Sequence, residues 1–271
     1  MTSPVSLYRS LETPVSWRTD VAPCIILTAG INNRVTLQLH NSPDSKEAPA
    51  LSAGGLIIRL YEIPVFNELP IDPVEASIGE GDTGVDVSIR VPKDIQRGYY
   101  RAQVARWRTD KDNIDDIYHC WVVVDKQLNP APDRFMDINS IRSQFADVCS
   151  LDNRMLESLE VSAGDIAAAV CRCLEQWRDT APRVSSYNGY NFPYPEILRN
   201  GVLYTLIQSL WTFLERNRMQ YQAGGVSVDL ERRADSFLRL KQEYEQLWRV
   251  GMQQAKMQEN VMSFDRGLWY E

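Results

Sequence analysis

The chain has 271 residues, which at roughly 100 to 200 residues per domain favours two domains. Hydrophobic residues make up 44% and charged residues 24%, close to globular averages, which argues against a disordered, collagen-like or coiled-coil chain. The formal net charge of -7 argues against specific binding to nucleic acid or to an anionic membrane, since both need a clustered cationic face.

The sequence also predicts the compartment. No apolar run reaches the roughly 20 residues that cross a bilayer, and the first residues lack the basic and apolar segments of a signal peptide. The five cysteines are few and odd in number, which favours buried, reduced thiols over a disulfide framework. We therefore expect a protein made and kept in a cytoplasm.

Residues 21–125 follow a period of two, which is typical of half-buried strands. Val85, Val87, Ile89 and Val91 alternate with polar residues and so share one face of a strand. Similar runs occur at residues 24–29, 34–39, 56–63, 99–107 and 117–124. Six or seven short strands separated by turns predict an antiparallel β-sandwich of immunoglobulin-like size.

Residues 128–134, LNPAPDR, contain two prolines and no periodicity, which favours an extended connector. Beyond it the apolar period changes to 3.6. We therefore predict a β-sandwich domain at 1–128, a linker at 129–137 and an α-helical domain at 138–271. The predicted fold class is α+β in two domains.

The first clear helix spans residues 162–178, behind Ser162 and Asp165, which resemble a capping box. Its apolar residues recur at helical spacing: Ile166, Val170, Cys173, Leu174 and Trp177. A weaker segment at 138–148 predicts another short helix. Together with two longer helices described next, these segments predict a bundle of about four helices.

Pro195 and Glu196 open a helix that we expect to reach about residue 221, because proline and an acidic residue suit a first turn. Its apolar residues cover more than one stripe, which indicates a helix enclosed by neighbours: Ile197, Val202, Leu203, Leu206, Ile207, Leu210, Trp211, Phe213 and Leu214. A last helix at about 229–260 is predicted to pack by one stripe: Leu230, Ala234, Phe237, Leu238, Tyr244, Leu247 and Trp248.

Candidate metal ligands fail on geometry. Cys171 and Cys173 lie about 200° apart around the predicted helix, so both thiolates cannot reach one ion, and we expect ordinary burial. His119 and Cys120 are adjacent on a strand and face opposite sides. His40 stands alone near a loop.

The acidic segment Asp110 to Asp116 invites comparison with a calcium loop. An EF-hand alignment from Asp110 places Asp115 at the turn glycine and Trp121 at the bidentate glutamate, so it fails twice. We expect a solvated hairpin tip there, and a weak cation site of another kind stays open.

Catalytic motifs are also missing from the sequence. It contains neither a G-x-S-x-G elbow nor a P-loop, and both histidines belong to the β domain. With 36 acidic residues some carboxylate pair is always permitted, which is no evidence for a glycosidase. We therefore predict a protein without enzymatic activity, with no catalytic residue, no cofactor and no metal site.

Two aromatic segments are candidates for protein contact. Residues 186–195, SYNGYNFPYP, place Tyr187, Tyr190, Phe192 and Tyr194 just before the helix that begins at Pro195. Tyrosine supplies rigid contact area at low entropic cost, which suits a binding loop, but the alternative that the segment packs over its own helices is the favoured one.

The C-terminal segment is too short to make a core of its own. It carries four large apolar residues, Phe264, Leu268, Trp269 and Tyr270. Left exposed, these side chains would be a hydrophobic liability, so we expect the segment to dock. Its own bundle and a neighbouring protein are both open as docking sites.

Two long segments resemble the helical domain of tailed-bacteriophage virion proteins, particularly neck or connector proteins between portal and tail. They are residues 161–182, VSAGDIAAAVCRCLEQWRDTAP, and residues 195–248. The resemblance rests on a Trp-x-x-x-x-Pro helix end, a buried helix, an AGG-V-S-V turn and a long amphipathic helix. The predicted sandwich also resembles immunoglobulin-like modules of phage structural proteins, a fold that hosts many functions.

The resemblance implies a virion structural protein, made in the host cytoplasm and acting as a repeated subunit of the phage neck. Its implied partners are portal, tail or neck proteins and further copies of itself, without nucleic acid or membrane. A baseplate or head-decorating position in the same virion is an alternative. So is a carbohydrate- or protein-binding accessory module in which the sandwich and the loop at 187–194 hold the ligand.

Overall fold

The computed structural model describes residues 5–8, 24–40, 54–63, 74–78, 84–107, 114, 116–125, 138–144, 161–183, 187, 191–216, 222–223, 226–227 and 231–267. The chain forms two compact units. The β unit comprises Met1–Phe135, Ser162–Ala168 and Asn188–Tyr190, and the helical unit comprises Met136–Val161, Ala169–Tyr187 and Asn191–Glu271. The predicted linker at 129–137 lies outside the described residues, and the domain bounds stay a prediction.

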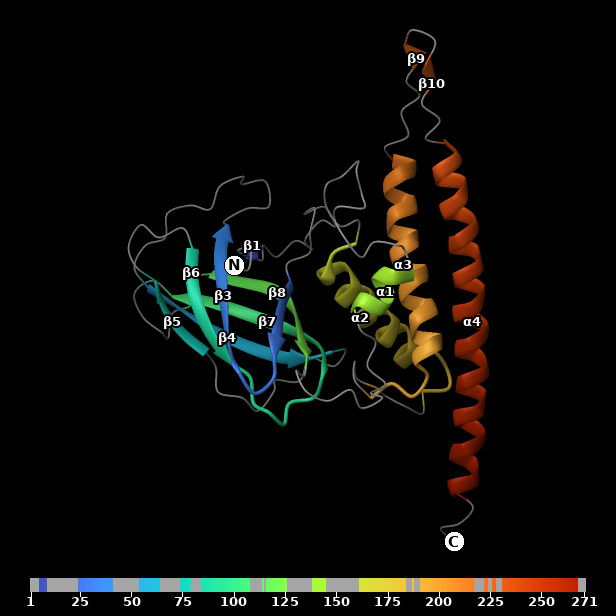
Figure 1. Cartoon of the computed structure of the whole chain (residues 1–271). Coiled ribbons are helices and arrows are strands. Elements are labelled where there is room, and N and C mark those ends of the chain that lie inside the picture. Colours follow the sequence, from blue (N-terminus) through green and yellow to red (C-terminus); the bar gives the residue numbers. More distant parts are fainter. Residues whose placement is uncertain are drawn as a thin grey trace. The chain divides into compact units, whose positions relative to one another are not determined.

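The fold class is α+β, with strands in the N-terminal half and helices in the C-terminal half, as predicted (Figure 1). The strands of the β unit are β1 (Val5–Tyr8), β2 (Cys24–Thr28), β3 (Asn32–His40), β4 (Gly54–Glu62), β5 (Val74–Ile78), β6 (Gly84–Arg90), β7 (Gly98–Trp107) and β8 (Asp116–Asp125). They form a three-stranded sheet of order β1-β3-β6 and a five-stranded sheet of order β2-β8-β7-β4-β5.

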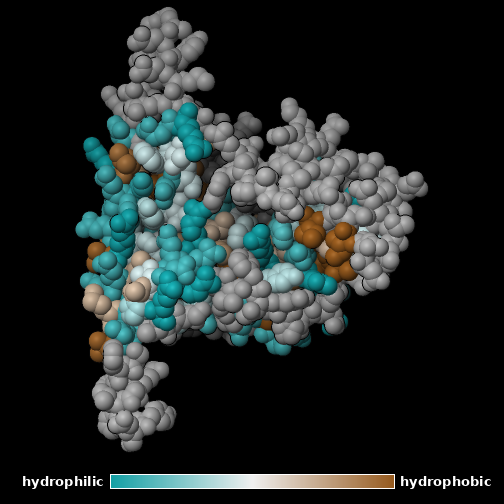
Figure 2. Space-filling model, turned by 180° about the vertical axis from the view of Figure 1, so that it is seen from behind, coloured by the Kyte–Doolittle hydropathy of each residue, from teal (hydrophilic) through white to brown (hydrophobic). Residues whose placement is uncertain are grey.

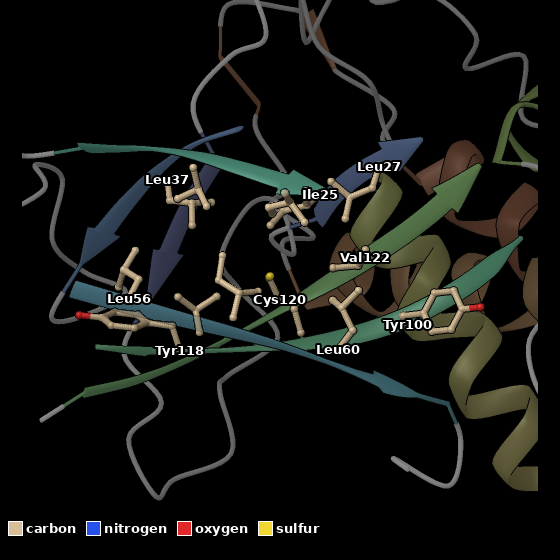
Figure 3. Packing of buried hydrophobic residues seen from close by; sticks show 14 of the residues in the cluster. Ile25, Leu27, Leu37, Leu56, Leu60, Tyr100, Tyr118, Cys120 and Val122 are labelled. Atoms are coloured by element: carbon tan, nitrogen blue, oxygen red, sulfur yellow. The ribbon is translucent and has the colours of Figure 1, made fainter. Parts of the chain in front are cut away.

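Alternation along the strands produces the core of the β unit. In β6 the side chains of Val85, Val87 and Ile89 are buried, and the residues between them are exposed. Side chains from both sheets point into one shared interior (Figure 3). The period-two prediction is therefore confirmed at β6, and it identifies the face that each strand turns inward.

The prediction of a purely antiparallel sandwich is wrong. β1 pairs parallel with β3, and β2 pairs parallel with β8, so both sheets are mixed. The strands β1 and β5 were also not expected. Side-chain alternation specifies which residues face the core but not the direction of the neighbouring strand, so the sequence pattern did not distinguish these pairings. An immunoglobulin-like topology is not confirmed.

The helices are α1 (Ile138–Gln144), α2 (Ala163–Asp179), α3 (Pro195–Arg216) and α4 (Glu231–Gly267), and all of them belong to the helical unit except residues 163–168 of α2, which belong to the β unit. Between α3 and α4, β9 (Gln222–Ala223) and β10 (Val226–Ser227) pair antiparallel. All four helices lie where the sequence predicted them. α4 continues seven residues beyond the predicted end at 260.

The start of α2 is a capping box, as predicted. The backbone N–H of Asp165 donates to Ser162 Oγ at 3.1 Å, and the backbone N–H of Ser162 donates to Asp165 Oδ2 at 3.2 Å. The Ser162 hydroxyl also donates to the same carboxylate at 2.6 Å. These bonds satisfy backbone donors that the first turn of a helix otherwise leaves without partners.

α3 and α4 pack along each other, and Figure 1 shows them side by side. A Cβ placed on Gly201 of α3 would lie 2.8 Å from the Trp248 ring of α4, and one on Gly251 would lie 3.2 Å from Ile197 Cγ1. The missing side chains therefore permit close approach of the two helices.

Two residues that the sequence placed in the interior are exposed. Leu247 was expected on the buried stripe of α4, but Trp248, about 100° further around the helix, occupies the contact with α3 instead. Phe213 lies near the C-terminal end of α3 and is also exposed, so α3 is not enclosed along its whole length. The prediction that α4 packs by a single apolar stripe is thus incomplete, since a second apolar surface lies on it.

Candidate functional site

Three of the four aromatic residues predicted for protein contact gather around Trp177 near the C-terminal end of α2. The ring centroid of Phe192 lies 4.8 Å from that of Trp177 in an edge-to-face arrangement, and the Tyr194 centroid lies at 5.7 Å. Tyr187 lies 6.3 Å from Trp177 and 5.5 Å from Phe192. These separations are those of attractive aromatic pairs. We call Trp177, Tyr187, Phe192, Tyr194 and Trp248 the aromatic cluster.

A lysine of α4 is buried against this cluster. Lys256 is 1% exposed, and its Nζ lies 4.8 Å from the Trp177 ring centroid, a cation–π distance. Its Nζ donates to the carbonyl oxygen of Pro182 at 3.3 Å. Burial lowers the pKa of Lys256, and the nearby carboxylate of Glu259 acts in the opposite direction.

Hydrogen bonds fix the tyrosine and tryptophan edges of the aromatic cluster. The Tyr187 hydroxyl donates to Glu259 Oε1 at 2.6 Å, and Trp248 Nε1 donates to Gln176 Oε1 at 3.3 Å. Burial, with the Glu259 charge as a second cause, raises the pKa of Tyr194. These hydrogen bonds therefore tie Tyr187 to α4, and α4 to α2.

The aromatic cluster is largely an internal feature of the helical unit. Phe192 is buried, and Tyr187 and Tyr194 are half-buried. Tyr190 lies outside the described residues. The described side chains thus contact one another and the helices beside them, and the part of these residues in binding another protein stays a prediction.

A different surface of the helical unit is both apolar and exposed. Five residues of α4 share it: Leu240, Leu247, Val250, Met257 and Val261. Their exposed fractions run from 42% at Leu240 to 68% at Val261. At about 100° per residue they fall within a sector of about 100° on the helix. We call these five residues the α4 stripe.

Val250 and Met257 of the α4 stripe lie away from the face of α4 that packs on α3, while Leu240 and Leu247 lie at the border of that face, near Gly251. Trp248 and Ala255 are buried, and Gly251 is half-buried beside Ile197 of α3. Trp248 and Ala255 lie roughly opposite Val250 and Met257 around the helix axis, and Gly251 lies about 100° to 120° from them. Figure 2 shows apolar side chains at several heights of the α4 column, separated by hydrophilic ones. α4 is therefore apolar on two sides.

The sequence held a signal for this stripe that the predictions did not use. Its members follow one another by seven, three, seven and four residues, which is the alternation of a heptad. Pattern alone does not tell which of two apolar sides of a helix faces its own bundle. The heptad spacing was the one available hint that the two sides differ.

The C-terminal candidates lie at or beyond the end of α4. Phe264 belongs to the helix backbone, but its side chain lies outside the described residues, as do Leu268, Trp269 and Tyr270. In sequence, Phe264 and Leu268 follow Val261 by three and by a further four residues. The heptad spacing of the α4 stripe therefore continues into the predicted docking segment.

None of the four cysteines in the described part of the chain forms a disulfide. Cys120, Cys171 and Cys173 are buried, Cys24 is half-buried, and Cys149 lies outside the described residues. Cys173 Sγ lies 3.6 Å from Thr205 Oγ1, and Cys171 Sγ lies 3.7 Å from Glu175 Oε1. Burial raises the pKa of Cys173 to about 12, which keeps this thiol protonated and unreactive.

Other candidate groups do not gather into a site in the described part of the chain. There, no three His, Cys, Asp or Glu side chains come close enough together to bind a metal ion. Of the acidic segment at 110–116, Ile114 and the backbone of Asp116 are described and the rest is not, so its cation site stays untested. Burial, with the Arg101 charge as a second cause, lowers the pKa of His119.

No described helix has the length and hydropathy to span a bilayer.

Comparison with known proteins yields a likeness to solved structures only. No protein-family model and no curated protein matches the chain. Among solved structures it is similar to the N-terminal domain of ORF48 of phage TP901-1, with 9% sequence identity and a TM-score of 0.30. The match covers 45% of this chain and 98% of the phage domain. The matched protein comes from a phage, but so low a TM-score identifies neither the fold nor the function of this chain.

Proposed function

We propose that this protein is a non-enzymatic structural subunit of a tailed-phage particle and acts through protein–protein contacts. The observation that carries the proposal is the α4 stripe, an exposed apolar surface on a helix of 37 residues. Exposed apolar surfaces of this kind mark sites of association in folded proteins. The sequence resemblance of residues 161–182 and 195–248 to phage neck proteins supports the particle as the setting.

Within the particle, we propose the neck, as a repeated subunit of a ring between portal and tail. A connector channel must let DNA pass without holding it, and a chain of net charge -7 suits this task because phosphates are repelled. The partners are then portal, tail or other neck proteins, and further copies of this chain.

The test is a mass measurement of the purified protein, alone and mixed with portal protein, by light scattering after size exclusion. The neck role predicts a new species heavier than either component. Two unchanged masses in the mixture would contradict it, as would retention of the protein on DNA at moderate salt. Turnover of a peptidoglycan, polysaccharide, ester or nucleotide substrate that one Asp or Glu substitution abolishes would contradict the non-enzymatic role.

The C-terminal segment gives the same proposal a second test. If Phe264, Leu268, Trp269 and Tyr270 dock on a neighbouring virion protein, deleting residues 263–271 leaves the melting temperature unchanged and blocks particle assembly. If they dock on their own bundle, the same deletion lowers the melting temperature, because each buried apolar side chain contributes roughly 1.5 to 3 kcal/mol. A deletion without either effect would remove this segment from the proposal.

A further inference from the structure

We infer that the α4 stripe is the contact between copies of this chain, which associate through α4 as a parallel, in-register coiled coil. The inference deepens the proposed function and rests on it for its biological setting, since it names the partner of the surface that carries that function. The residues that carry it are Leu240, Leu247, Val250, Met257 and Val261.

The spacing of the α4 stripe specifies a helix as the occupant. In heptad notation Leu240, Leu247 and Val261 take position a, while Val250 and Met257 take position d. A repeat of 3.5 residues drifts around a straight helix and stays in contact with a partner that is itself a helix, because the two supercoil together. A partner that met the stripe with a sheet or an irregular surface would not require a repeat of 3.5 residues.

The polar surroundings of the stripe suit an identical helix. From Val250 to Met262 every exposed residue of α4 is uncharged: Val250, Gln253, Gln254, Met257, Gln258, Val261 and Met262. Elsewhere the chain is rich in charge, with a net value of -7 that makes copies repel one another. An uncharged face lowers this repulsion where two copies would meet.

The glutamines make this face self-complementary. An amide carries both a donor and an acceptor, so Gln254 at position a is able to pair with Gln254 of another copy. A single polar residue at position a is also the feature that sets register in parallel coiled coils. By contrast, a partner of opposite charge would need charged residues on this face, and the exposed residues from 250 to 262 offer none.

One residue limits the extent of the contact. Glu243 takes position d between Leu240 and Leu247, and in register it would face the same carboxylate of another copy. Like charges across a coiled-coil seam are destabilising, so the contact is centred on residues 247–261 and weakens towards the N-terminal end of α4.

The first experiment compares the self-association of two charge-matched variants by sedimentation equilibrium. Val250→Glu/Met257→Glu adds two negative charges on the stripe. Gln242→Glu/Arg249→Gln changes the net charge by the same amount at exposed positions about 100° or more around the helix from the centre of the stripe. The control loses the Arg249 ion pair with Glu245, a surface pair of little weight, and the hydrogen bond between Arg249 and the Tyr204 hydroxyl.

We expect the unsubstituted protein to associate reversibly. Its average mass in sedimentation equilibrium should then rise with protein concentration. The stripe variant should weaken the association constant by roughly tenfold or more, because it places unpaired charges in a buried seam. The control should stay within about threefold of the unsubstituted protein, as rim charges have small effects. A monomer at about 100 µM, or equal masses for the two variants, would overturn the inference.

The second experiment tests register with a short thiol-reactive cross-linker. Gln254→Cys places a thiol on the predicted seam, and Gln242→Cys places one at an exposed position outside it. In-register helices bring the two thiols of Gln254→Cys together, so a covalent dimer should form well above the background of the unsubstituted chain. Equal cross-linking of both variants, or none for Gln254→Cys, would overturn the parallel arrangement.

The outcomes separate this inference from the proposed function. Self-association of the purified protein needs no other virion protein, whereas the neck role is measured with portal protein. A chain that stays monomeric and still binds portal protein would overturn the inference and support the neck role. A chain that associates through the stripe without binding portal protein would support the inference and contradict the neck role.

Discussion

The two units of the molecule build their interiors from different kinds of side chain. The core of the β unit is largely aliphatic, with residues such as Leu27 and Val87 buried between two sheets. The aromatic cluster of the helical unit combines tryptophan and tyrosine rings with a buried ammonium group at Lys256 and several hydrogen bonds. Aliphatic burial is non-directional, whereas the aromatic cluster depends on particular pairs of groups. Substitutions in the β unit should therefore lower stability by removing buried volume, and substitutions in the aromatic cluster should lower it by disturbing particular pairs of groups.

The largest effect is expected for Leu27→Ala in the β unit. Leu27 is fully buried, while its neighbour Ile26 is 59% exposed on the opposite face of β2. Truncation of a buried leucine costs about 2 to 5 kcal/mol through lost burial and the cavity left behind. Ile26→Ala should change the free energy of unfolding by no more than about 0.5 kcal/mol. Urea denaturation measures both, and equal losses would contradict the sheet arrangement.

The strands of the β unit show how much of the fold the sequence predicts. Alternation placed one face of Val85 to Val91 in the core, and the structure agrees, because period two follows from strand geometry alone. The parallel partners of β2 and β3 were not predictable, since they are distant in sequence and alternation carries no direction.

For the helices, positions along the chain were predictable and side-chain environments were not. The capping residues Ser162 and Asp165 gave the start of α2 because their effect is local. Lys256 was not expected inside, since lysine is seldom fully buried and its partners come from distant segments. Two apolar sides of α4 were visible in the sequence, but which one faces α3 depends on Trp248 and Gly201 meeting in space.

The second prediction concerns the close approach of α3 and α4. In Gly201→Ala the new Cβ would lie 2.8 Å from the Trp248 ring and 3.1 Å from Cys173 Sγ. We expect a net loss of about 1 to 3 kcal/mol from overpacking, although alanine favours helix. Gly251→Ala is the matched control, because its Cβ would meet the flexible Ile197 side chain at 3.2 Å. Thermal unfolding measures both, and an equal or smaller loss for Gly201→Ala would contradict the packing described.

The third prediction tests a local, directional interaction at the start of α2. Ser162→Ala removes the hydroxyl that accepts from the Asp165 N–H at 3.1 Å. Loss of such a cap costs about 1 kcal/mol. Ser162→Thr is the control, since threonine also caps and should retain most of the stability. Urea denaturation distinguishes the two variants, and equal destabilisation by both would show that the hydroxyl does not act as the cap.

The smallest effect near neutral pH is expected for Lys256→Met, which keeps the buried stem and removes the ammonium group. Removing a buried charge relieves its desolvation, and this gain offsets the lost cation–π contact with Trp177 and the hydrogen bond to Pro182. We therefore expect little change in the free energy of unfolding at neutral pH. The difference between the two proteins should appear as the pH rises.

The direction in which stability changes with pH follows from the lowered pKa of Lys256 in the folded protein. Between that pKa and the ordinary lysine value of about 10.4, the unfolded chain holds a proton that the folded chain has released, so stability rises with pH. Tyr194 and Tyr204 have raised pKa values and act in the opposite direction above about pH 10, and both proteins retain them. The stability of the unsubstituted protein relative to Lys256→Met should therefore increase between neutral pH and about pH 10. Urea denaturation across this range measures the difference, and parallel pH profiles would show that Lys256 is solvated and not buried in the aromatic cluster.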